Sequence, residues 1–503
     1  MLEPSGRPLY LAEQVRELDR RVIAGGIEGF ALMQRAATAA YDALRERWPR
    51  VRHLSVFCGS GNNAGDGYVM AALAVCDGLS VQLIAVRDPQ SLSGDAARAL
   101  EMAEKAGLRV QIWHPELDLA GDVVVDALLG TGLSGEVREP YRGVIEAINA
   151  SGKPVFAVDI PSGLSANSGA VLGTAIEATL TVTFIGDKPG LHTGAAVAHV
   201  GEHRLASLGV DVHQHADVPP VATLLDAGLV DALLPPRRRD SHKGDQGHVL
   251  VLGGAPGFGG AALLASECAA RLGAGKVSLA TAPEHVAASL VRCPEVMVHG
   301  VRSATEVTSL LNAAEVLVVG PGLGQGAWGQ AMLQVALATD KPLVVDADAL
   351  NLLASWWSSR RRDNWILTPH PGEAARLLGS SGARVQADRL GAAQELQRLR
   401  GGIVILKGAG TVVAGPSDVG ICPYGNPGMA SGGMGDVLSG MLGALLAQRL
   451  PLEPAARLGT ILHARAADIA AEAGGERGLL ASDLACYARR LANPRNDDAG
   501  ETR

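Results

Sequence analysis

A glycine-rich segment near the C-terminus carries the residues with the clearest chemical potential in this chain. It spans residues 426–440, reads NPGMASGGMGDVLSG, and places glycines directly before Asp436 and an apolar, helix-like run. Glycine lets the backbone approach a ligand closely, and free N–H groups at a helix start bind anions. An aspartate beside such an anion site can accept the proton of an attacking hydroxyl. The segment therefore predicts phosphoryl transfer to an alcohol, although a glycine-rich turn with an ordinary N-cap aspartate is the alternative.

Polar side chains also follow three apolar runs in the first half of the chain. They are Asn62, Asn63 and Asp66 in GSGNNAGDG, Asp126 after VVV, and Asp159 with Ser162 in FAVDIPS. Side-chain oxygens that converge at the carboxyl ends of parallel strands suit a hard cation, or a sugar and phosphate. The alternative is that Asp126 and Asp159 only cap the loops that follow them. Lys188, in FIGDKPGL, also follows a strand, but by spacing alone it reads as a turn residue.

Strands that alternate with helices must position these side chains, and both halves of the chain predict them. The predicted strands lie within 51–59, 81–86, 121–135, 154–163 and 178–186, and within 248–254, 276–281, 315–324, 342–348, 364–370 and 402–408. This alternation predicts parallel sheets covered on both faces, hence an α/β fold class with two doubly wound domains. Helical periodicity over 9–48 is broken by Gly25, Gly26 and Gly29. The loop after the first strand lacks the spacing G-x-G-x-x-G, which argues against a redox Rossmann domain.

Composition limits the class of protein. The 503 residues are too many for one core, and 47% apolar with 19% charged residues indicate a globular chain. A net charge of −8 and the lack of a basic, aromatic-rich surface argue against nucleic acid as a partner. Six cysteines without a CxxC pair suggest reduced thiols in a cytosolic protein. We see no signal peptide and no membrane-spanning run, so we expect a soluble, cytoplasmic protein.

The two patterned halves meet in a segment rich in prolines and charges, residues 212–245. We predict a first domain over 1–215, a linker over 216–240 that partly folds onto the second domain, and a second domain over 241–495.

Ten ordered motifs resemble those of the bifunctional NAD(P)H-hydrate repair enzymes over nearly the whole chain. The first half carries GSGNNAGDGYV, DALLGTGLSGE, AVDIPSGLSANSG and FIGDKPGL; the second carries HKGDQGHVLVLGG, GPGLG, VVDADALN, TPHPGEAARLLG, LKGAGTVV and NPGMASGGMGD. The resemblance implies an N-terminal epimerase domain of the YjeF N-terminal type, a Rossmann-like αβα sandwich. It also implies a C-terminal ADP-dependent dehydratase domain of the ribokinase-like type.

In the first domain the resemblance implies a potassium ion bound by Asn63, Asp126 and Ser162. Asp159 and Lys188 would handle the protons, which fits inversion at a carbinolamine carbon because that reaction needs acid–base help. The implied contacts to the hydrated nicotinamide nucleotide are Asn62, Asn63, Ala64, Gly65, Asp66, Gly130, Thr131, Gly132, Leu133, Ser134, Gly135, Glu136 and Asp159. Ala64 stands where the family usually has glycine, and a methyl group disfavours a positive φ.

In the second domain the resemblance makes Asp436 the catalytic base. His370, in TPHPGE, would contact the hydrated nicotinamide, and Glu373 would help to organise magnesium through water. The implied substrate contacts are Ala261, Gly322, Gly324, His370 and Asp436, and the implied contacts to ADP or AMP are Lys407, Gly408, Ala409, Gly410, Thr411 and Gly435.

The resemblance thus implies an enzyme that is both an isomerase and a lyase. It would interconvert the R and S hydrates of NADH and NADPH, and use ADP to return the S hydrate to NAD(P)H with release of AMP and phosphate. The implied cofactors are K⁺ in the epimerase and Mg²⁺ in the dehydratase, and the implied partners are small molecules and further copies in a homo-oligomer. Two alternatives stay open: a vitamin or sugar kinase fused to a nucleotide-binding module, and a first half that is a non-catalytic sensing or protein-binding module.

Overall fold

The computed structural model describes residues 6–493, which divide into two compact units. One unit is Pro8–Ala222, and the other runs from Thr223 onward and takes in the few described residues before Pro8. The boundary falls within strand β1 (Gly6–Leu9) and strand β9 (Ala222–Leu225). The predicted linker over 216–240 contains β9 and helix α6 (Leu229–Leu233). Residues 1–5 of the predicted first domain and 494–495 of the predicted second lie outside the described residues.

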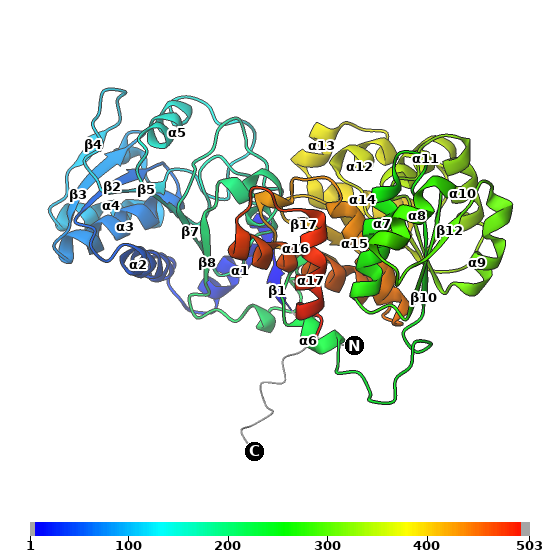
Figure 1. The fold of residues 1–503 in the computed structure, drawn as a ribbon. Coiled ribbons are helices and arrows are strands. Elements are labelled where there is room, and N and C mark those ends of the chain that lie inside the picture. Colours follow the sequence, from blue (N-terminus) through cyan, green and yellow to red (C-terminus); the bar gives the residue numbers. More distant parts are fainter. Residues whose placement is uncertain (1–5, 494–503) are drawn as a thin grey trace, which may run out of the picture. The chain divides into compact units, whose positions relative to one another are not determined.

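The unit Pro8–Ala222 is built on a parallel sheet in the order β4-β3-β2-β5-β6-β7-β8 (Figure 1). Its strands are β2 (His53–Cys58), β3 (Ser80–Ala85), β4 (Val110–Ile112), β5 (Val123–Ala127), β6 (Val155–Val158), β7 (Leu180–Phe184) and β8 (Glu202–Ala206). From β2 the chain adds β3 and β4 on one side, then returns to add β5 to β8 on the other. The order therefore reverses between β2 and β5, where the loops after the two strands leave a crevice for a ligand.

Helices cover both faces of this sheet because successive strand residues point to opposite faces. Val56 and Cys58 pack in one core with helices α1 to α4, whereas Phe57 between them packs in a second core with α5. The helices are α1 (Ala12–Ala24), α2 (Gly29–Arg47), α3 (Asn62–Cys76), α4 (Gly94–Lys105) and α5 (Tyr141–Ala150). Gly25, Gly26 and Gly29 lie between α1 and α2 or at the start of α2, where the sequence predicted a break.

The second unit, within the described residues, has an eleven-stranded sheet in the order β1-β9-β18-β17-β16-β15-β14-β13-β10-β11-β12. Its strands besides β1 and β9 are β10 (His248–Leu252), β11 (Lys276–Thr281), β12 (Met297–Gly300), β13 (Val316–Val319), β14 (Leu343–Val345), β15 (Trp365–Leu367), β16 (Ile403–Leu406), β17 (Thr411–Ala414) and β18 (Val419–Cys422). The strands from β12 to β16 are parallel, and their order reverses between β10 and β13.

The expected parallel sheet ends at β16, because β16, β17 and β18 pair in antiparallel fashion. Gly408 and Gly410 have φ values of 136° and 60° in the short connection between β16 and β17. Glycine permits these left-handed conformations, so the chain turns back without a crossover helix. The predicted nucleotide loop 407–411 is therefore the turn of a hairpin.

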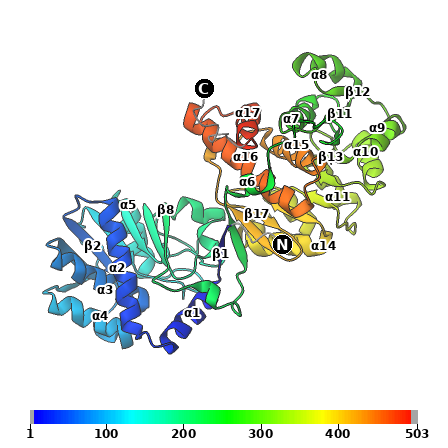
Figure 2. The ribbon, with the colours of Figure 1, turned by 90° about the horizontal axis from the view of Figure 1, so that it is seen from below.

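Helix α15 (Met434–Ala447) is the central helix of the second unit and is buried on nearly every side. It shares one core with α7 (Gly259–Arg271), α16 (Leu452–Gly474), α17 (Ala481–Leu491) and strands β10 and β13. Helices α7 and α15 lie side by side in both views (Figures 1 and 2). They approach so closely that a Cβ on Gly440 would collide with the Ala265 carbonyl oxygen. This packing fixes the first turn of α15, and with it Asp436.

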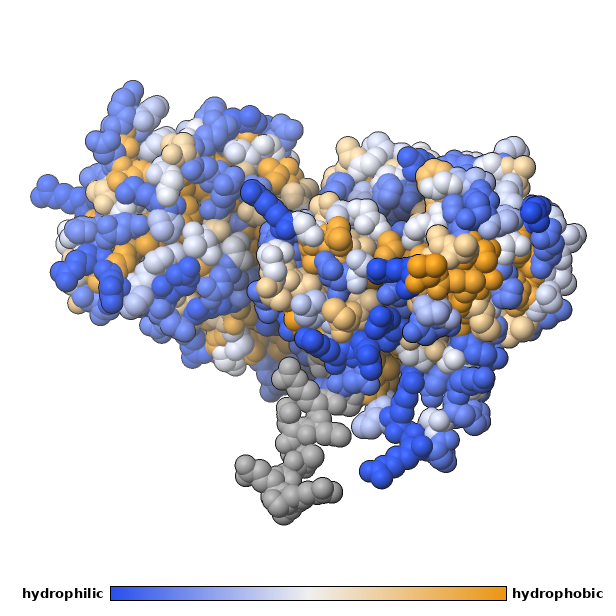
Figure 3. Space-filling model, viewed as in Figure 1, coloured by the Kyte–Doolittle hydropathy of each residue, from blue (hydrophilic) through white to orange (hydrophobic). Residues whose placement is uncertain are grey.

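The remaining helices of this unit connect the parallel strands. They are α8 (Val286–Arg292), α9 (Thr308–Ala313), α10 (Ala327–Leu337), α11 (Ala347–Trp356), α12 (Pro371–Leu378), α13 (Gly382–Ala387) and α14 (Arg389–Arg400). The predicted fold class, two doubly wound α/β domains, is confirmed. Hydrophilic residues are spread over the viewed face of both units (Figure 3), and no helix among residues 6–493 is long and apolar enough to cross a membrane.

Candidate active sites

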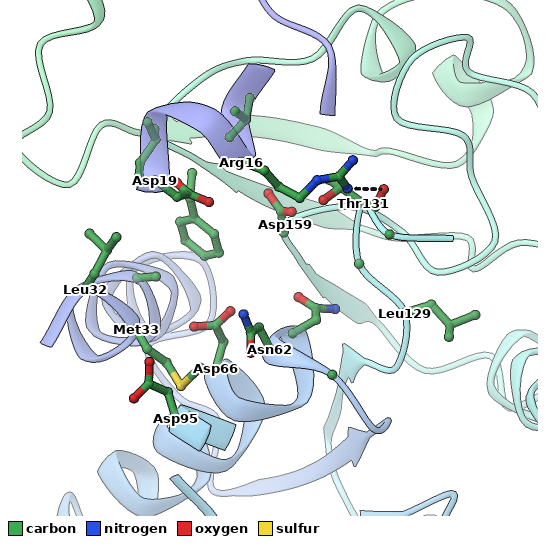
Figure 4. A pocket seen from close by; sticks show the side chains of 18 of the residues that line it. Arg16, Asp19, Leu32, Met33, Asn62, Asp66, Asp95, Leu129, Thr131 and Asp159 are labelled. Carbon is green, nitrogen blue, oxygen red and sulfur yellow. Dashed lines mark hydrogen bonds between the residues drawn. The ribbon is translucent and has the colours of Figure 1, made fainter. Parts of the chain in front are cut away.

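A cavity of about 610 Å³ opens at the β2–β5 crevice of the first unit (Figure 4). The predicted site residues that line it are Asn62, Asn63, Asp66, Gly130, Thr131, Gly132, Leu133, Ser134, Asp159 and Lys188. Ala64, Gly65, Gly135 and Glu136 are outside its lining. Ala64 is buried inside α3 and does not have a positive φ, so alanine fits its backbone there.

An ion pair between Lys188 and Asp159 lies at one wall of this cavity. Lys188 Nζ donates to Asp159 Oδ1 at 2.6 Å and to Thr183 Oγ1 at 2.6 Å, and the Thr183 hydroxyl donates to Asp159 Oδ1 at 3.0 Å. The lysine side chain is 1% exposed and the aspartate side chain 17% exposed. The aspartate is therefore the member of the pair that a bound molecule reaches more readily.

The backbone at Asp159 helps to aim its carboxylate. Asp159 has φ of 66°, and the N–H of Ile160 donates to the Val158 carbonyl at 2.8 Å, which closes a tight turn at the end of β6. A positive φ is costly for a residue with a Cβ, and such strain is held at functional sites when the surroundings determine it. Here the ion pair with Lys188 and the N–H of Asp159, bonded to the Val182 carbonyl at 2.8 Å, hold it.

Three further carboxyl groups, those of Asp19, Asp66 and Asp95, share the cavity with Asp159 (Figure 4), and two of them have a raised pKa. Burial raises the pKa of Asp19 to about 6, and the negative charge of Asp159 adds to the rise while Lys188 opposes it. Burial also raises the pKa of Asp66 well above its ordinary value. These groups can carry protons near neutral pH, so the cavity holds both a charged pair and protonatable acids.

Sequence reasoning missed Asp19, and with it Arg16 and Thr183. Asp19 lies one helical turn from Val15 on α1, and both line the cavity, so an acidic residue interrupts an apolar face. That interruption was the available signal. Arg16 reaches across to the Thr131 carbonyl at 3.4 Å, as the dashed line in Figure 4 marks.

Asp126 and Ser162, two of the predicted potassium ligands, are in direct contact beneath the cavity. Ser162 donates its hydroxyl to Asp126 Oδ1 at 2.6 Å and its N–H to Oδ2 at 2.8 Å. Burial raises the pKa of Asp126 to about 6, although these hydrogen bonds oppose the rise. The third predicted ligand, Asn63, has both side-chain polar atoms buried without a hydrogen-bond partner among the described residues.

The second unit has its own lysine–aspartate pair, at the end of β14. Lys407 Nζ lies 2.7 Å from Asp346 Oδ1, and the Ser439 hydroxyl donates to Asp346 Oδ2 at 2.7 Å. Burial alone would raise the pKa of Asp346, but the Lys407 ammonium and the Ser439 hydroxyl hold it below its ordinary value. A Cβ on Gly435 would lie 3.0 Å from Lys407 Nζ, so glycine lets the start of α15 approach the lysine.

Asp436, the predicted base, lies in the first turn of α15 beside this pair. Burial raises its pKa to about 7, and the negative charge of Asp346 adds to the rise while Lys407 opposes it. A carboxyl group with a pKa near neutrality is suited to accept a proton, because it is both partly ionised and basic enough. Sequence reasoning did not single out Asp346, although it follows an apolar strand as Asp126 and Asp159 do.

His370 and Glu373 form a reciprocal cap at the start of α12. The His370 imidazole accepts from the N–H of Gly372 at 2.9 Å, and Glu373 Oε2 accepts from the N–H of His370 at 2.8 Å. Burial raises the pKa of Glu373 to about 7, opposed by Lys407. Burial and the Lys407 charge lower the pKa of His370, so its imidazole is neutral at physiological pH. The imidazole is half-exposed.

Three of the predicted substrate contacts, Ala261, Gly322 and Gly324, lie at the β10–β13 switch point. A Cβ on Gly322 would lie 3.2 Å from that of Ala261, so the loop after β13 meets the start of α7. The N–H of Gly324 donates to Asp348 at 2.9 Å, and the charge of Asp348 contributes to the raised pKa of Asp436. The predicted nucleotide loop 407–411 begins with Lys407, so it lies beside the Lys407–Asp346 pair.

Two family models match the chain, one for each unit. The model described as NAD(P)H-hydrate dehydratase matches residues 249–490, and the model described as YjeF-related protein N-terminus matches residues 29–190. A protein of Coxiella burnetii named bifunctional NAD(P)H-hydrate repair enzyme is 50% identical over 487 residues, which cover 97% of this chain and 99% of the relative. An Escherichia coli protein of the same name is 44% identical over 496 residues, covering 97% and 95%.

Solved structures resemble the second unit. A ribokinase-like superfamily protein of Enterococcus faecalis has 28% identity and a TM-score of 0.51, covering 54% of this chain and 96% of its own. A hypothetical protein of Streptococcus mutans has 27% identity and a TM-score of 0.50, covering 54% and 100%.

Proposed function

Because the chain belongs to the family of bifunctional NAD(P)H-hydrate repair enzymes, we propose that it epimerises hydrated NADH and NADPH and dehydrates the S hydrate with ADP. The observation that carries this proposal is the occurrence of two separate lysine–aspartate sites, each at the carboxyl ends of parallel strands and each in a unit that one family model matches.

In the epimerase unit the hydrated nicotinamide lies in the cavity against Asp159. Asp159 takes the proton of the carbinolamine hydroxyl as the bond from that carbon to the ring nitrogen opens, which leaves an aldehyde and an electron pair on the nitrogen. The nitrogen then attacks the other face of the aldehyde, and Asp159 returns the proton to the oxygen. The Lys188 ammonium stabilises the Asp159 carboxylate before the first proton transfer and after the last. Asp19 and Asp66, with raised pKa values, are proton donors or reservoirs in the same cavity. The loop 130–134 covers the nucleotide.

Asn63, Asp126 and Ser162 are the residues that would hold a potassium ion. Two features support the fit: the Asn63 amide oxygen is buried without a partner, and no basic side chain pairs with Asp126 in the ion pairs of residues 6–493. Oxygen donors of this kind suit a hard cation. When bound, the ion supplies positive charge next to the nucleotide.

In the dehydratase unit Asp436 accepts the proton of the ring hydroxyl as the β-phosphoryl group of ADP is transferred to that oxygen. The N–H groups at the start of α15 and the Lys407 ammonium stabilise the charge on the phosphoryl oxygens. Phosphate is then a good leaving group, and its loss together with a ring proton restores the dihydropyridine. The products are NAD(P)H, AMP and phosphate.

The carboxylates Asp348 and Glu373 would hold Mg²⁺ through water, beside Lys407 and the glycine-rich helix start. Burial raises the pKa of Glu373 to about 7, so a cation that favours its ionised form fits this site. When bound, the ion supplies positive charge to the phosphates. The His370 imidazole, neutral and half-exposed, contacts the hydrated nicotinamide.

The two activities in one chain have a stereochemical reason. A dehydratase that accepts one epimer leaves the other unrepaired unless an epimerase interconverts them. We include in the proposal that the enzyme works in the cytoplasm and self-associates, as the family resemblance implies.

A mixture of R and S hydrates of NADH tests the proposal. With ADP we expect complete recovery of NADH absorbance, together with one AMP and one phosphate per NADH. Recovery of only the S fraction would contradict the epimerase activity. No recovery, with phosphorylation of a vitamin alcohol or a sugar instead, would favour the kinase alternative, and replacing ADP by ATP measures the nucleotide preference.

A further inference from the structure

Three metal-ligating side chains converge next to Lys188, outside the lining of the cavity. Asp187 directly precedes the lysine, His192 follows the short turn Pro189–Leu191, and His203 lies on β8. Their ligand atoms all lie within 4.8 Å of one another, and Asp187 Oδ1 lies 2.9 Å from His192 Nε2 and 3.2 Å from His203 Nε2. The side chains are 0%, 8% and 13% exposed in that order.

Hydrogen bonding alone leaves this cluster incompletely satisfied. Asp187 Oδ1 already accepts the N–H of Lys188 at 2.9 Å and lies at 2.9 Å from His192 Nε2. His203 Nε2 is buried and has no hydrogen-bond partner among the described residues, although it points at the same oxygen. A buried nitrogen without a partner costs stability, and such an atom in a native structure calls for a ligand.

The types of donor atom in this cluster suit a cation. Asp187 is fully buried, and its Oδ1 lies 2.9 Å from His192 Nε2 and 3.2 Å from His203 Nε2. A fully buried carboxylate next to two imidazole nitrogens provides one oxygen and two nitrogen donors. This donor set is typical of zinc sites, and imidazole with carboxylate suits divalent transition metals in general.

We propose that Asp187 Oδ1, His192 Nε2 and His203 Nε2 bind one divalent transition-metal ion, with Zn²⁺ as the preferred metal and a water molecule as the fourth ligand. Ligand atoms about 2.0–2.1 Å from a tetrahedral zinc are about 3.3 Å apart. The observed separations of 2.9 and 3.2 Å are close to that value, so the ion enters with small side-chain movements. The ion takes the lone pairs of both Nε2 atoms and releases any proton bound there.

The site ties the loop that carries Lys188 to β8. None of the three ligands lines the cavity, so the ion is structural: it holds the loop after β7 in place and does not touch the substrate. The proposal concerns residues separate from Asn63, Asp126 and Ser162, and it does not rest on the proposed reaction.

The test uses the untagged full-length protein, freed of metal with a chelator and titrated with Co²⁺ and then Zn²⁺. We expect one tightly bound equivalent of Co²⁺ with the visible absorption of tetrahedral nitrogen and oxygen coordination, displaced by Zn²⁺, and a rise in Tm with Zn²⁺. The double variant His192→Gln, His203→Gln should bind the metal at least about 100-fold more weakly. His213→Gln, which removes an exposed histidine of the same unit, should bind as the wild type does.

Three results would overturn the proposal. One is a wild type that binds neither metal tightly, and another is an unchanged stoichiometry in the folded double variant. The third is a Co²⁺ spectrum dominated by thiolate charge transfer, which would assign the metal to cysteines. The wild-type titration and spectrum decide the question even where the double variant fails to fold.

Discussion

Both units pair a lysine with a strand-end aspartate, but they bury opposite members of the pair. In the first unit Lys188 is 1% exposed and Asp159 17% exposed, whereas in the second Lys407 is 21% exposed and Asp346 1% exposed. The N–O distances, 2.6 and 2.7 Å, are nearly the same. The first pair thus presents a carboxylate to its ligand, and the second presents an ammonium group.

This difference suits the first pair to proton transfer and the second pair to phosphate binding. A carboxylate backed by a buried cation stays charged and can exchange protons with a substrate. An ammonium group backed by a buried carboxylate stays charged and attracts a phosphate, so the second unit needs a separate base, for which we propose Asp436. The predictions below test this assignment of roles.

The largest effect is expected from Asp436→Asn. Removal of the base should lower ADP-dependent dehydration of the S hydrate by about 10²–10⁴-fold, because general base catalysis contributes in that range. NADH absorbance measures the rate, and epimerisation should be unchanged. Asp340→Asn, an exposed change of the same kind in the same unit, should retain wild-type activity. Equal activity of the two variants would remove Asp436 from the mechanism.

Asp159→Asn should slow epimerisation by about 10²-fold. This is the low end of the range of about 10²–10⁴-fold for general acid–base catalysis, because the Lys188 ammonium remains to polarise the substrate. Dehydration of pure S hydrate should stay unaffected. Chromatographic separation of the two epimers over time measures the rate. Asp118→Asn, exposed in the same unit, is the control. If Asp159→Asn equilibrates the epimers at the wild-type rate, the first pair is not the proton-handling pair.

Lys407→Met should raise KM for ADP more than it lowers kcat for dehydration. Loss of one charged hydrogen bond to phosphate corresponds to about 10–100-fold in affinity, so we expect KM for ADP to rise by that factor. Lys188→Met should instead lower kcat for epimerisation with a smaller change in KM. Steady-state kinetics on both reactions distinguish these patterns, and thermal unfolding shows whether the unpaired Asp346 or Asp159 has destabilised either variant. Identical KM and kcat effects in the two variants would contradict the distinction between the pairs.

The pairs also show what a sequence pattern can and cannot predict. Asp126, Asp159 and the strands before them were predictable because an apolar run followed by an acidic residue is a local signal, and Asp436 was predictable from its glycines. Asp346 has the same signal and was accessible to the same reasoning. Asp19 was not singled out. Its place within an apolar helix face was a local signal, but only the tertiary structure shows that this face lines a cavity.

Strand β9 illustrates the limit for the fold. It lies in a segment predicted as a linker, and it pairs in parallel with β18, whose residues are distant in the sequence. No local pattern encodes such a pairing, since it depends on where the hairpin β17–β18 is placed. The antiparallel edge of the second sheet was missed for a different reason. A local turn signal was present in Gly408 and Gly410, but these residues were assigned to a nucleotide loop.

The pH dependence of dehydration should follow Asp436. Its pKa is raised to about 7, and it must be ionised to accept a proton, so kcat/KM should rise with pH through about 7 and level off about one pH unit higher. At about one pH unit below the pKa of Asp436, kcat/KM should be about tenfold lower than on the plateau. Glu373 has a similar pKa, so Glu373→Gln is the informative control. Glu373→Gln should keep the rise of kcat/KM with pH. If the rise disappears in this variant, the titrating group is Glu373.

The smallest effect is expected from Asp19→Asn, and it concerns stability. The folded pKa of Asp19, about 6, lies above its ordinary value of 3.8, so the folded protein holds the proton more tightly than the unfolded chain does. The stability from that proton is present at low pH and is lost as pH rises through about 6. Asparagine has no such loss, so the Tm advantage of the variant should grow from pH 4 to pH 8. After a discount for solvent screening, the gain in the free energy of unfolding should reach about 1 kcal/mol, which corresponds to a Tm that is higher by roughly 2–4 °C. An advantage that is independent of pH would mean that Asp19 is not a buried acid of the cavity, and the first site would then rely on Asp66 alone as its protonated group.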